Sequence, residues 1–374
     1  MIGIKTINMK KIGREVAFLK THALNPRNGE GSFAYLSNGS IIHAYTEYYG
    51  DSGEDDATAR IAYITSNNEG ETWSNPAILL DKDNLAQNYM SISLIRLPNG
   101  DLGMFFLRKE IAKSPNSNNE EIRCMPAFCY STDEGKTWSD YVFCIDRLGY
   151  YCGINDGILL QKNGRLLMPL SSEPDNCVYI VASNDCGRSW YTICSPISLP
   201  FTDFNSSGLA EPGLYEHENG TLWLYCRTFL GYQYQSLSID NGKTWSSVIP
   251  NLYFSSPDAP MRVKRIGDYT IAVFNPSSCN CLSPSNARRP LVCAISTNDG
   301  ASFQDFTNFA DSSKMKIFAS KLFAIENDPA NTYCYPSIIE VKDGFLVAYY
   351  HSEGDSFPLR ATKIVKVLFN EIFN

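Results

Sequence analysis

Several acidic and basic residues occupy positions that packing alone explains poorly. The stretch 48–61, YYGDSGEDDATARI, is rich in carboxylates, with Asp55 and Asp56 near its centre. Glu211 precedes a proline, and Arg227 ends the apolar run LWLYC. Carboxylates can transfer protons during catalysis, and a guanidinium can bind an anionic group through paired hydrogen bonds. A charged loop is commonly just solvated. The role of these residues therefore has to be judged from the strands and turns that position them.

Other carboxylates belong to a turn that the chain uses five times. The copies are SNNEGETW (66–73), STDEGKTW (131–138), SNDCGRSW (183–190), SIDNGKTW (238–245) and STNDGASF (296–303). Ser and Asp can hydrogen-bond to nearby backbone groups, Gly accepts a left-handed conformation, and Trp can pack between sheets. Asn68 and Asn298 replace the Asp in two copies and still supply a side-chain oxygen. Because the same chemistry recurs, we predict that these turns build the fold and take no part in catalysis.

A second repeat alternates with these turns. Six segments, most with Asn-Gly or Asp-Gly, lead into β-rich runs: 37–46, 98–107, 162–171, 218–227, 266–275 and 342–351. Asn-Gly before such a run predicts a tight hairpin. Units of about 50–60 residues with four strand-sized segments are typical of propeller blades. We therefore expect an all-β fold, with residues 1–374 forming one six-bladed β-propeller domain of four-stranded antiparallel blades. The segment 14–20 is expected to complete the last blade.

Composition and charge indicate which partners, location and metal sites to expect. The net charge of −8 disfavours nucleic acid and anionic membrane surfaces as partners. The N-terminal segment has no signal-peptide pattern, and no apolar run reaches the roughly 18 residues of a spanning helix, so we predict a cytoplasmic protein. The 12 Cys are scattered and there are only four His, which predicts reduced thiols, no metal site and no cofactor. The oligomeric state stays open.

The five turns resemble the Asp-boxes of the sialidase (neuraminidase, BNR-repeat) superfamily, and the resemblance extends over nearly the whole chain. It implies a six-bladed propeller. It also implies a retaining mechanism in which a Tyr, activated by a Glu, attacks a sugar whose anomeric carbon bears a carboxylate. Three arginines bind that carboxylate in the family, and an Asp acts as acid and base.

The resemblance assigns several residues of the C-terminal half. AEPGLYEHENGTLWLYCRT (210–228) is similar to the family stretch that carries the Glu and the second Arg, which implies that Glu211 activates the nucleophile and that Arg227 binds substrate. NARRPLVCAIS (286–296) implies Arg288 or Arg289 as the third Arg. YCYPSIIEVKDG (333–344) implies Tyr335 as the nucleophile, with Tyr333 as the alternative.

The N-terminal half departs from the family pattern. The family's Arg-Ile-Pro motif is missing from NPRNGEGSFAYLSNG (25–39). Arg27 is the available replacement for the first arginine, and Glu30 lies near the place where that arginine is expected. In the loop 48–61, Asp55 fits best as the acid and base, with Asp56 next to it.

Six further residues are candidate substrate contacts. Arg108 and Lys109 lie at the end of the second β-rich run, and Asn155 and Asp156 precede the third. Gln233 and Tyr234 combine hydrogen bonding with an aromatic face, which suits a sugar. Turn or capping chemistry is the competing explanation for the first four.

We therefore expect an exo-acting retaining glycoside hydrolase that removes a terminal sialic acid or related acidic sugar from a carbohydrate. Two alternatives remain. One is a propeller that binds glycan or protein without catalysis. The other is a glycosidase for a different sugar that uses only carboxylates, namely Asp55, Glu211 and Glu30.

Overall fold

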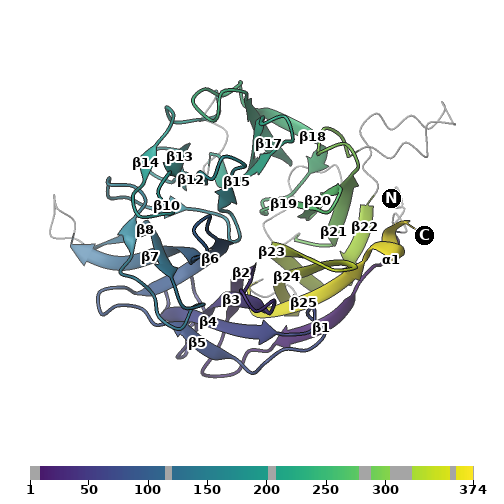
Figure 1. The fold of residues 1–374 in the computed structure, drawn as a ribbon, viewed down its shortest axis with the longest axis horizontal. Coiled ribbons are helices and arrows are strands. Elements are labelled where there is room, and N and C mark those ends of the chain that lie inside the picture. The colour runs from purple at the N-terminus through teal and green to yellow at the C-terminus, as the bar shows by residue number, and fades with distance from the viewer. Residues whose placement is uncertain are drawn as a thin grey trace, which may run out of the picture.

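The structure is a computed structural model that describes residues 9–113, 120–200, 208–277, 288–303, 322–353 and 359–373. Its strands form six sheets, five of four strands and one of five, and the paired strands within each sheet are antiparallel. Figure 1 shows these sheets arranged as blades around a central axis. The prediction of a six-bladed, four-stranded β-propeller is confirmed, with one short extra strand in the third blade.

The first three blades follow one another along the chain. Blade one contains β2 (Asn28–Tyr35), β3 (Ile41–Tyr48), β4 (Ala59–Ser66) and β5 (Ala77–Leu80). Blade two contains β6 (Asn88–Arg96), β7 (Leu102–Lys113), β8 (Glu120–Ser131) and β9 (Val142–Phe143). Blade three contains β10 (Tyr151–Cys152), β11 (Leu159–Leu160), β12 (Leu166–Ser172), β13 (Cys177–Ser183) and β14 (Tyr191–Thr192).

The remaining blades complete the ring. Blade four contains β15 (Ala210–Glu216), β16 (Leu222–Arg227), β17 (Tyr232–Ser238) and β18 (Ile249–Ser255). Blade five contains β19 (Arg262–Ile266), β20 (Tyr269–Phe274), β21 (Leu291–Ser296) and β22 (Leu322–Glu326). Blade six contains β23 (Asn331–Val341), β24 (Gly344–Glu353), β25 (Ala361–Leu368) and β1 (Arg14–Leu19), and the helix α1 (Phe369–Phe373) follows β25.

The N-terminal strand closes the ring. β1 pairs antiparallel with β25, from Arg14 opposite Lys366 to Leu19 opposite Thr362, and so supplies the outermost strand of blade six. This confirms the expectation for the segment 14–20. The pairing ties the two ends of the chain together, so that the last blade has the same number of strands as its neighbours.

The five repeated turns each lie between the last two strands that the chain contributes to a blade before it enters the next one. In the copy at 131–138, the Ser131 hydroxyl accepts from Gly135 N at 2.7 Å and donates to Asp133, which also accepts from the backbone and hydroxyl of Thr137. The same pattern recurs in the other four copies. The hydrogen bonds from Thr137 lower the pKa of Asp133 to about 2. Asp133 and the Asp or Asn at the same position of the other copies thus use their side-chain oxygens within the turns, as predicted.

Apolar side chains fill the spaces between blades. Among the described residues, six clusters of buried side chains each join two neighbouring blades. The Trp that closes a repeated turn packs into the cluster between its own blade and the preceding one, as Trp190 does between blades two and three. Packing of this kind fixes each blade against the next, and hence the positions of the strands that surround the axis.

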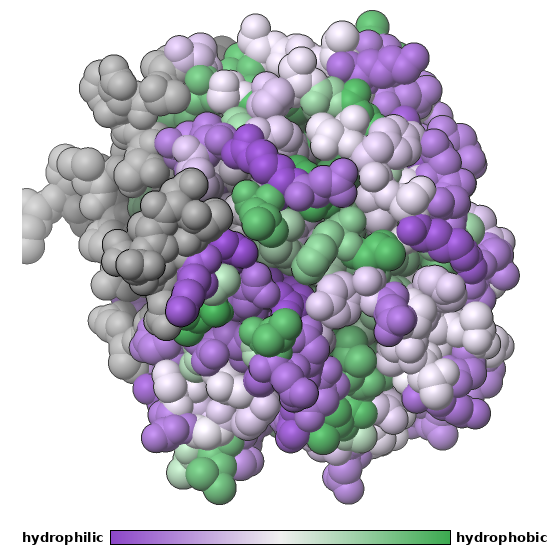
Figure 2. Space-filling model, turned by 90° about the vertical axis from the view of Figure 1, so that its left-hand side faces the viewer, coloured by the Kyte–Doolittle hydropathy of each residue, from purple (hydrophilic) through white to green (hydrophobic). Residues whose placement is uncertain are grey.

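The outer surface has a mixed character. On the side seen in Figure 2, hydrophobic residues form small separate groups among hydrophilic ones. Within the described ranges, no helix has the length and apolar character needed to cross a membrane.

Candidate active site

A cavity of about 590 Å³ opens where the first strands of the blades surround the axis. The strand β2 contacts β6 and β23, and β19 contacts β15 and β23, so these strands form the wall nearest the axis. The charged and phenolic residues that line the cavity come from blades far apart in the sequence. They include Glu30, Asp55, Glu211, Arg227, Arg288 and Tyr335.

Four residues reach the cavity from β-bulges. The register shifts at Glu30 in β2, Ser91 in β6, Glu211 in β15 and Tyr335 in β23. All four have positive φ, of 52°, 54°, 41° and 55° respectively. A bulge inserts one extra residue, which bends the strand and redirects a side chain. The same local device therefore presents all four side chains to one cavity.

Tyr335 and Glu211 form the central contact. Tyr335 Oη donates a short hydrogen bond to Glu211 Oε1. Arg227 Nη1 donates to Glu211 Oε2 at 2.6 Å and lies 3.4 Å from Tyr335 Oη. The structure thus brings together three residues that lie up to 124 positions apart. A phenol is bonded to a carboxylate able to accept its proton, and a guanidinium lies beside both.

Burial raises the pKa of Tyr335 well above its usual value, and the negative charge of Glu211 raises it further. Arg227 and Arg288 act in the opposite direction. The phenol is therefore neutral at physiological pH. It can become a nucleophile only by passing its proton to a neighbouring base, and Glu211 is in hydrogen-bonding contact with it.

Arg288 also lines the cavity, and its guanidinium carbon is 5.6 Å from the centre of the Tyr335 ring. Its Nε and Nη2 donate to the carbonyl oxygen of Asp258 at 3.2 and 3.1 Å. The Asp258 carboxylate accepts from Arg227 through Nε and through Nη2, the latter at 2.7 Å. One residue thus orients both arginines. Arg289 is not among the described residues that line the cavity.

Arg27 lies behind the cavity wall. It is fully buried between the rings of Tyr48 and Tyr350, and it is not among the described residues that line the cavity. Its guanidinium donates to Asp55 Oδ1 at 2.5 Å and to Glu30 Oε1 at 2.7 Å. In this structure, Arg27 therefore serves two carboxylates of the protein, and Glu30 reaches the cavity in front of it.

The two carboxylates that share Arg27 have pKa values shifted in opposite directions. Burial raises the pKa of Asp55, but the charge and hydrogen bond of Arg27 outweigh burial and hold that pKa below its usual value. Burial is also the largest influence on Glu30 and raises its pKa, although Arg27 and the Ser91 hydroxyl oppose the shift. Asp55 is thus ionised at neutral pH, whereas Glu30 holds a proton more readily than an ordinary carboxyl group.

Asp56 and Arg108, two of the other predicted substrate contacts, do not line the described part of the cavity. Asp56 pairs with Lys109 Nζ at 3.2 Å, and Lys109 lines the cavity. Arg108 is bound by Asp83 at 2.7 and 2.9 Å and by Glu110 at 2.5 Å, and it is absent from the described lining. Of these two consecutive cations in β7, Lys109 therefore lines the cavity and Arg108 does not.

Gln233, Tyr234 and Asp156 are also absent from the described lining. Gln233 Nε2 donates to Ser256 Oγ at 3.0 Å and to Ala259 O at 2.8 Å, which ties β17 to the segment between β18 and β19. Tyr234 packs in the core between blades three and four. Asp156 is buried near the axis and accepts from Ser32 Oγ at 2.8 Å and Lys264 Nζ at 2.7 Å.

Sequence reasoning missed Asp258 and Ser91. It pointed to Arg108 and Lys109 together, because side chains on a strand alternate between its faces and sequence alone did not fix which of two consecutive cations faces the axis. A short pattern could have found Ser91. In β2, β6 and β23, the bulged residue is followed two positions later by a serine, namely Ser32, Ser93 and Ser337.

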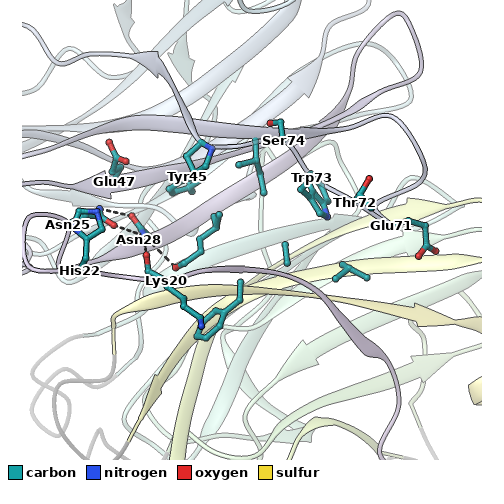
Figure 3. Close-up of a pocket in the computed structure, with 16 residues that line it drawn as sticks. Lys20, His22, Asn25, Asn28, Tyr45, Glu47, Glu71, Thr72, Trp73 and Ser74 are labelled. Atoms are coloured by element: carbon teal, nitrogen blue, oxygen red, sulfur yellow. Dashed lines mark hydrogen bonds between the residues drawn. The ribbon is translucent and has the colours of Figure 1, made fainter.

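A second cavity, of about 580 Å³, lies between β1 and blade one. Figure 3 shows Asn25 and Asn28 joined by hydrogen bonds at one end, with Tyr45 and Trp73 farther along. Its carboxylates are already paired, Glu47 with Arg60 and Glu71 with Lys366. None of the residues that the sequence singled out for catalysis lies there.

Comparison with known proteins agrees with this architecture. Residues 42–348 match the model of a family described as BNR repeat-like domain. An anhydrosialidase of Macrobdella decora is 30% identical over 132 residues, which are 33% of this chain and 16% of the relative. A sialidase of Paraclostridium sordellii is 23% identical over 244 residues, which are 59% of this chain and 57% of the relative.

These matches cover less than two thirds of either relative's length. Among solved structures, a leech intramolecular trans-sialidase complexed with 2,7-anhydro-Neu5Ac has the same fold. It superposes with a TM-score of 0.67 at 17% identity, over 97% of this chain and 71% of that one. The family match, the five repeated turns and the six blades agree, and the chain therefore belongs to the BNR repeat-like family of the sialidase superfamily.

Proposed function

We propose that this chain, as one propeller domain, is an exo-acting retaining glycoside hydrolase that removes a terminal sialic acid or a related acidic sugar. The observation that carries the proposal is the hydrogen bond from Tyr335 to Glu211 beside Arg227 in the axial cavity. A phenol paired with a carboxylate base is what a tyrosine nucleophile requires. The names of the relatives support the same class of reaction.

In the first step, Tyr335 Oη attacks the anomeric carbon and Glu211 accepts the phenolic proton. A neutral phenol has an advantage over a carboxylate here, because a sugar that bears a carboxylate on its anomeric carbon repels an anionic nucleophile. Arg227 donates to the other oxygen of Glu211 and lies 3.4 Å from Tyr335 Oη, so its positive charge stabilises the negative charge that develops on the phenolic oxygen.

Arg227 and Arg288 are the proposed ligands of the substrate carboxylate. Both line the cavity, and Asp258 holds both from behind. Each guanidinium carries five N–H donors, so contacts with the protein leave donors for a substrate. Lys109 is the other cation that lines the described part of the cavity. With Arg27 behind the wall, Glu30 faces the sugar, and a hydroxyl or ammonium group of the sugar would suit that position.

Asp55 is the proposed acid for the leaving oxygen. Its pKa is held low by Arg27, so it must take up a proton before it can act as an acid. We therefore expect the first step to be fastest at acidic pH. In the second step, the ionised Asp55 removes a proton from water, which attacks the anomeric carbon and releases Tyr335 to take its proton back from Glu211.

The raised pKa of Glu30 favours a second candidate, a glycosidase that uses carboxylates only. In that reaction, Glu30 would protonate the leaving oxygen, Glu211 or Asp55 would be the nucleophile, and Tyr335 would be a platform for the sugar. Such an enzyme would act on neutral glycosides, because a sugar without a carboxylate on its anomeric carbon does not repel an anionic nucleophile.

The test is turnover of a chromogenic sialoside by the wild type and by Tyr335→Phe. We expect release of the chromophore by the wild type and loss of at least about a hundredfold in kcat in the variant. Retained turnover by Tyr335→Phe, or turnover of neutral glycosides alone, would favour the carboxylate enzyme. No turnover of either class, with a glycan bound in the cavity, would indicate a binding protein. The mass of the released sugar would separate hydrolysis from intramolecular transfer, whose anhydro product is one water lighter.

A further inference from the structure

The bulges that aim residues at the cavity need support from outside their own strands. A residue other than Gly rarely has positive φ, and holding one there costs about 1–3 kcal/mol. At the bulge, the ladder of hydrogen bonds is also interrupted. Glu30, Ser91 and Tyr335 share this condition on three different blades. Some neighbouring group must therefore hold each bulge in place.

The segment 155–157, between β10 and β11, contacts all three of these bulges. Asn155 Nδ2 donates to Gly31 O at 2.8 Å, next to Glu30, and to the carbonyl oxygen of Tyr335 itself at 3.4 Å. Asp156 N donates to Ile92 O at 2.8 Å, next to Ser91. Gly157 N donates to Ser93 Oγ at 2.7 Å. Three consecutive residues of blade three thus bond to blades one, two and six.

The Asp156 carboxylate adds contacts to two of these strands. It accepts from Ser32 Oγ at 2.8 Å and from the backbone N of Ile338 at 3.1 Å. Lys264 Nζ donates both to Asp156, at 2.7 Å, and to the carbonyl oxygen of Ile338, at 2.9 Å. Both backbone groups of Ile338, three residues after Tyr335, are therefore held by one ion pair. Asp156 is 2% exposed, so these hydrogen bonds do not compete with bulk water.

We propose that Asn155 and Asp156 are positioning residues that hold the bulges of β2, β6 and β23, and through β23 the contact between Tyr335 and Glu211. This proposal rests on the proposed function, because it makes the two buried residues contributors to the attack of Tyr335. It assigns Asp156 a role behind the cavity wall in place of direct contact with the sugar. The fourth bulge has a separate support, since Glu211 N donates to Ser171 Oγ at 3.3 Å.

Catalysis is sensitive to such support. Displacement of a reacting group by about 1 Å can cost about a hundredfold in rate. Arg227 and Arg288, the proposed ligands of the sugar, are held by Asp258. The described hydrogen bonds and ion pairs of Asp258 do not involve the segment 155–157. Loss of Asn155 or Asp156 should therefore slow the attack of Tyr335 much more than it weakens substrate binding.

The experiment compares Asn155→Ala and Asp156→Asn with the control Asn251→Ala. Asn251 is also a buried asparagine with side-chain hydrogen bonds, but it lies in β18, the outermost strand of blade four. We expect kcat on a chromogenic sialoside to fall about tenfold to a hundredfold in the two test variants, with KM within about twofold of the wild type. We expect the control to lose thermal stability without a fall in kcat.

Two results would overturn the proposal. One is a kcat equal to that of Asn251→Ala, and the other is a rise in KM that accounts for the loss of kcat/KM. If Asp156→Asn does not fold, Asn155→Ala tests the proposal alone, since it removes no charge. A crystal structure of Asn155→Ala gives a readout independent of turnover. The proposal predicts that Tyr335 Oη moves away from Glu211, and an unmoved Tyr335 would contradict it even if the wild type hydrolysed no sialoside.

Discussion

Replacement of Glu211 by Gln isolates the base of the proposed reaction. The substitution keeps the shape of the side chain and removes its charge and its basicity. In the structure, Glu211 accepts from Tyr335 through Oε1 and from Arg227 through Oε2 at 2.6 Å. A glutamine can accept on one side only, so its NH₂ group must face either the phenol or the guanidinium. Both partners are donors at present, and one of them loses its acceptor.

The magnitude follows from these contacts. A positioned base contributes about 10²–10⁴-fold to a rate, so we expect kcat of Glu211→Gln to fall within that range. KM should not rise, because Arg227 loses a competing carboxylate and keeps its donors for the substrate. The negative charge of Glu211 also raises the pKa of Tyr335, so its removal should lower that pKa. The residual kcat of the variant should therefore increase as pH rises toward 10, as a larger fraction of Tyr335 ionises without a base.

The assay measures kcat and KM on a chromogenic sialoside between pH 5 and pH 10. Glu216→Gln is the matched control, since Glu216 lies at the other end of the same strand β15 and accepts from Lys162 N at 2.9 Å. A kcat for Glu211→Gln within about twofold of this control would refute the role of Glu211. So would a residual activity that declines steadily with rising pH.

Three further predictions follow from the site and the turns. Asp55→Asn should lose activity mainly on sialosides with poor leaving groups, because an activated phenol departs without an acid. Equal losses of kcat/KM on sialosides with poor leaving groups and on those with an activated phenol would argue against Asp55 as the acid. Arg288→Ala should raise KM for a sialoside about tenfold to a hundredfold, from loss of a charge-assisted contact of about 1.5–3 kcal/mol, whereas Arg289→Ala should leave KM near the wild type; the reverse order would reassign the carboxylate ligand. Asp240→Ala should lower the midpoint of thermal unfolding more than Asp240→Asn, since Asn keeps the side-chain oxygen. Hydrogen bonds from Thr244 lower the pKa of Asp240 to about 2, so the stability that its charge contributes is present above its unfolded pKa of about 4 and is lost as pH falls toward 2; a stability difference between wild type and Asp240→Asn that persists below pH 2 would contradict this.

The fold could be predicted from sequence because its signals are local and repeated. Each repeated turn is held by hydrogen bonds within eight residues, as Ser131, Asp133 and Thr137 show. The segments with Asn-Gly or a similar turn occur once in each blade, so their number gives the number of blades. Alternation along a strand is a similarly local rule. It fails at a bulge, where one inserted residue changes which side chains face the axis.

The site could be predicted only where the resemblance to a known family supplied residues. Glu211, Arg227 and Tyr335 were expected together, and the structure joins them by hydrogen bonds. The relation of Arg27 to Glu30 and Asp55 could not be predicted, because it depends on burial between two aromatic rings from different blades. The structural position of Asp156 likewise depends on contacts with residues more than a hundred positions away.

The proposed mechanism depends above all on a covalent bond between Tyr335 and the sugar. The most direct measurement is incubation with a fluorinated sialic acid that slows the second step, followed by mass spectrometry of the proteolysed protein. We predict one sugar per chain, attached to the peptide that contains Tyr335, and no attachment in Tyr335→Phe. A sugar attached to the peptide of Glu211, Asp55 or Glu30 would contradict it.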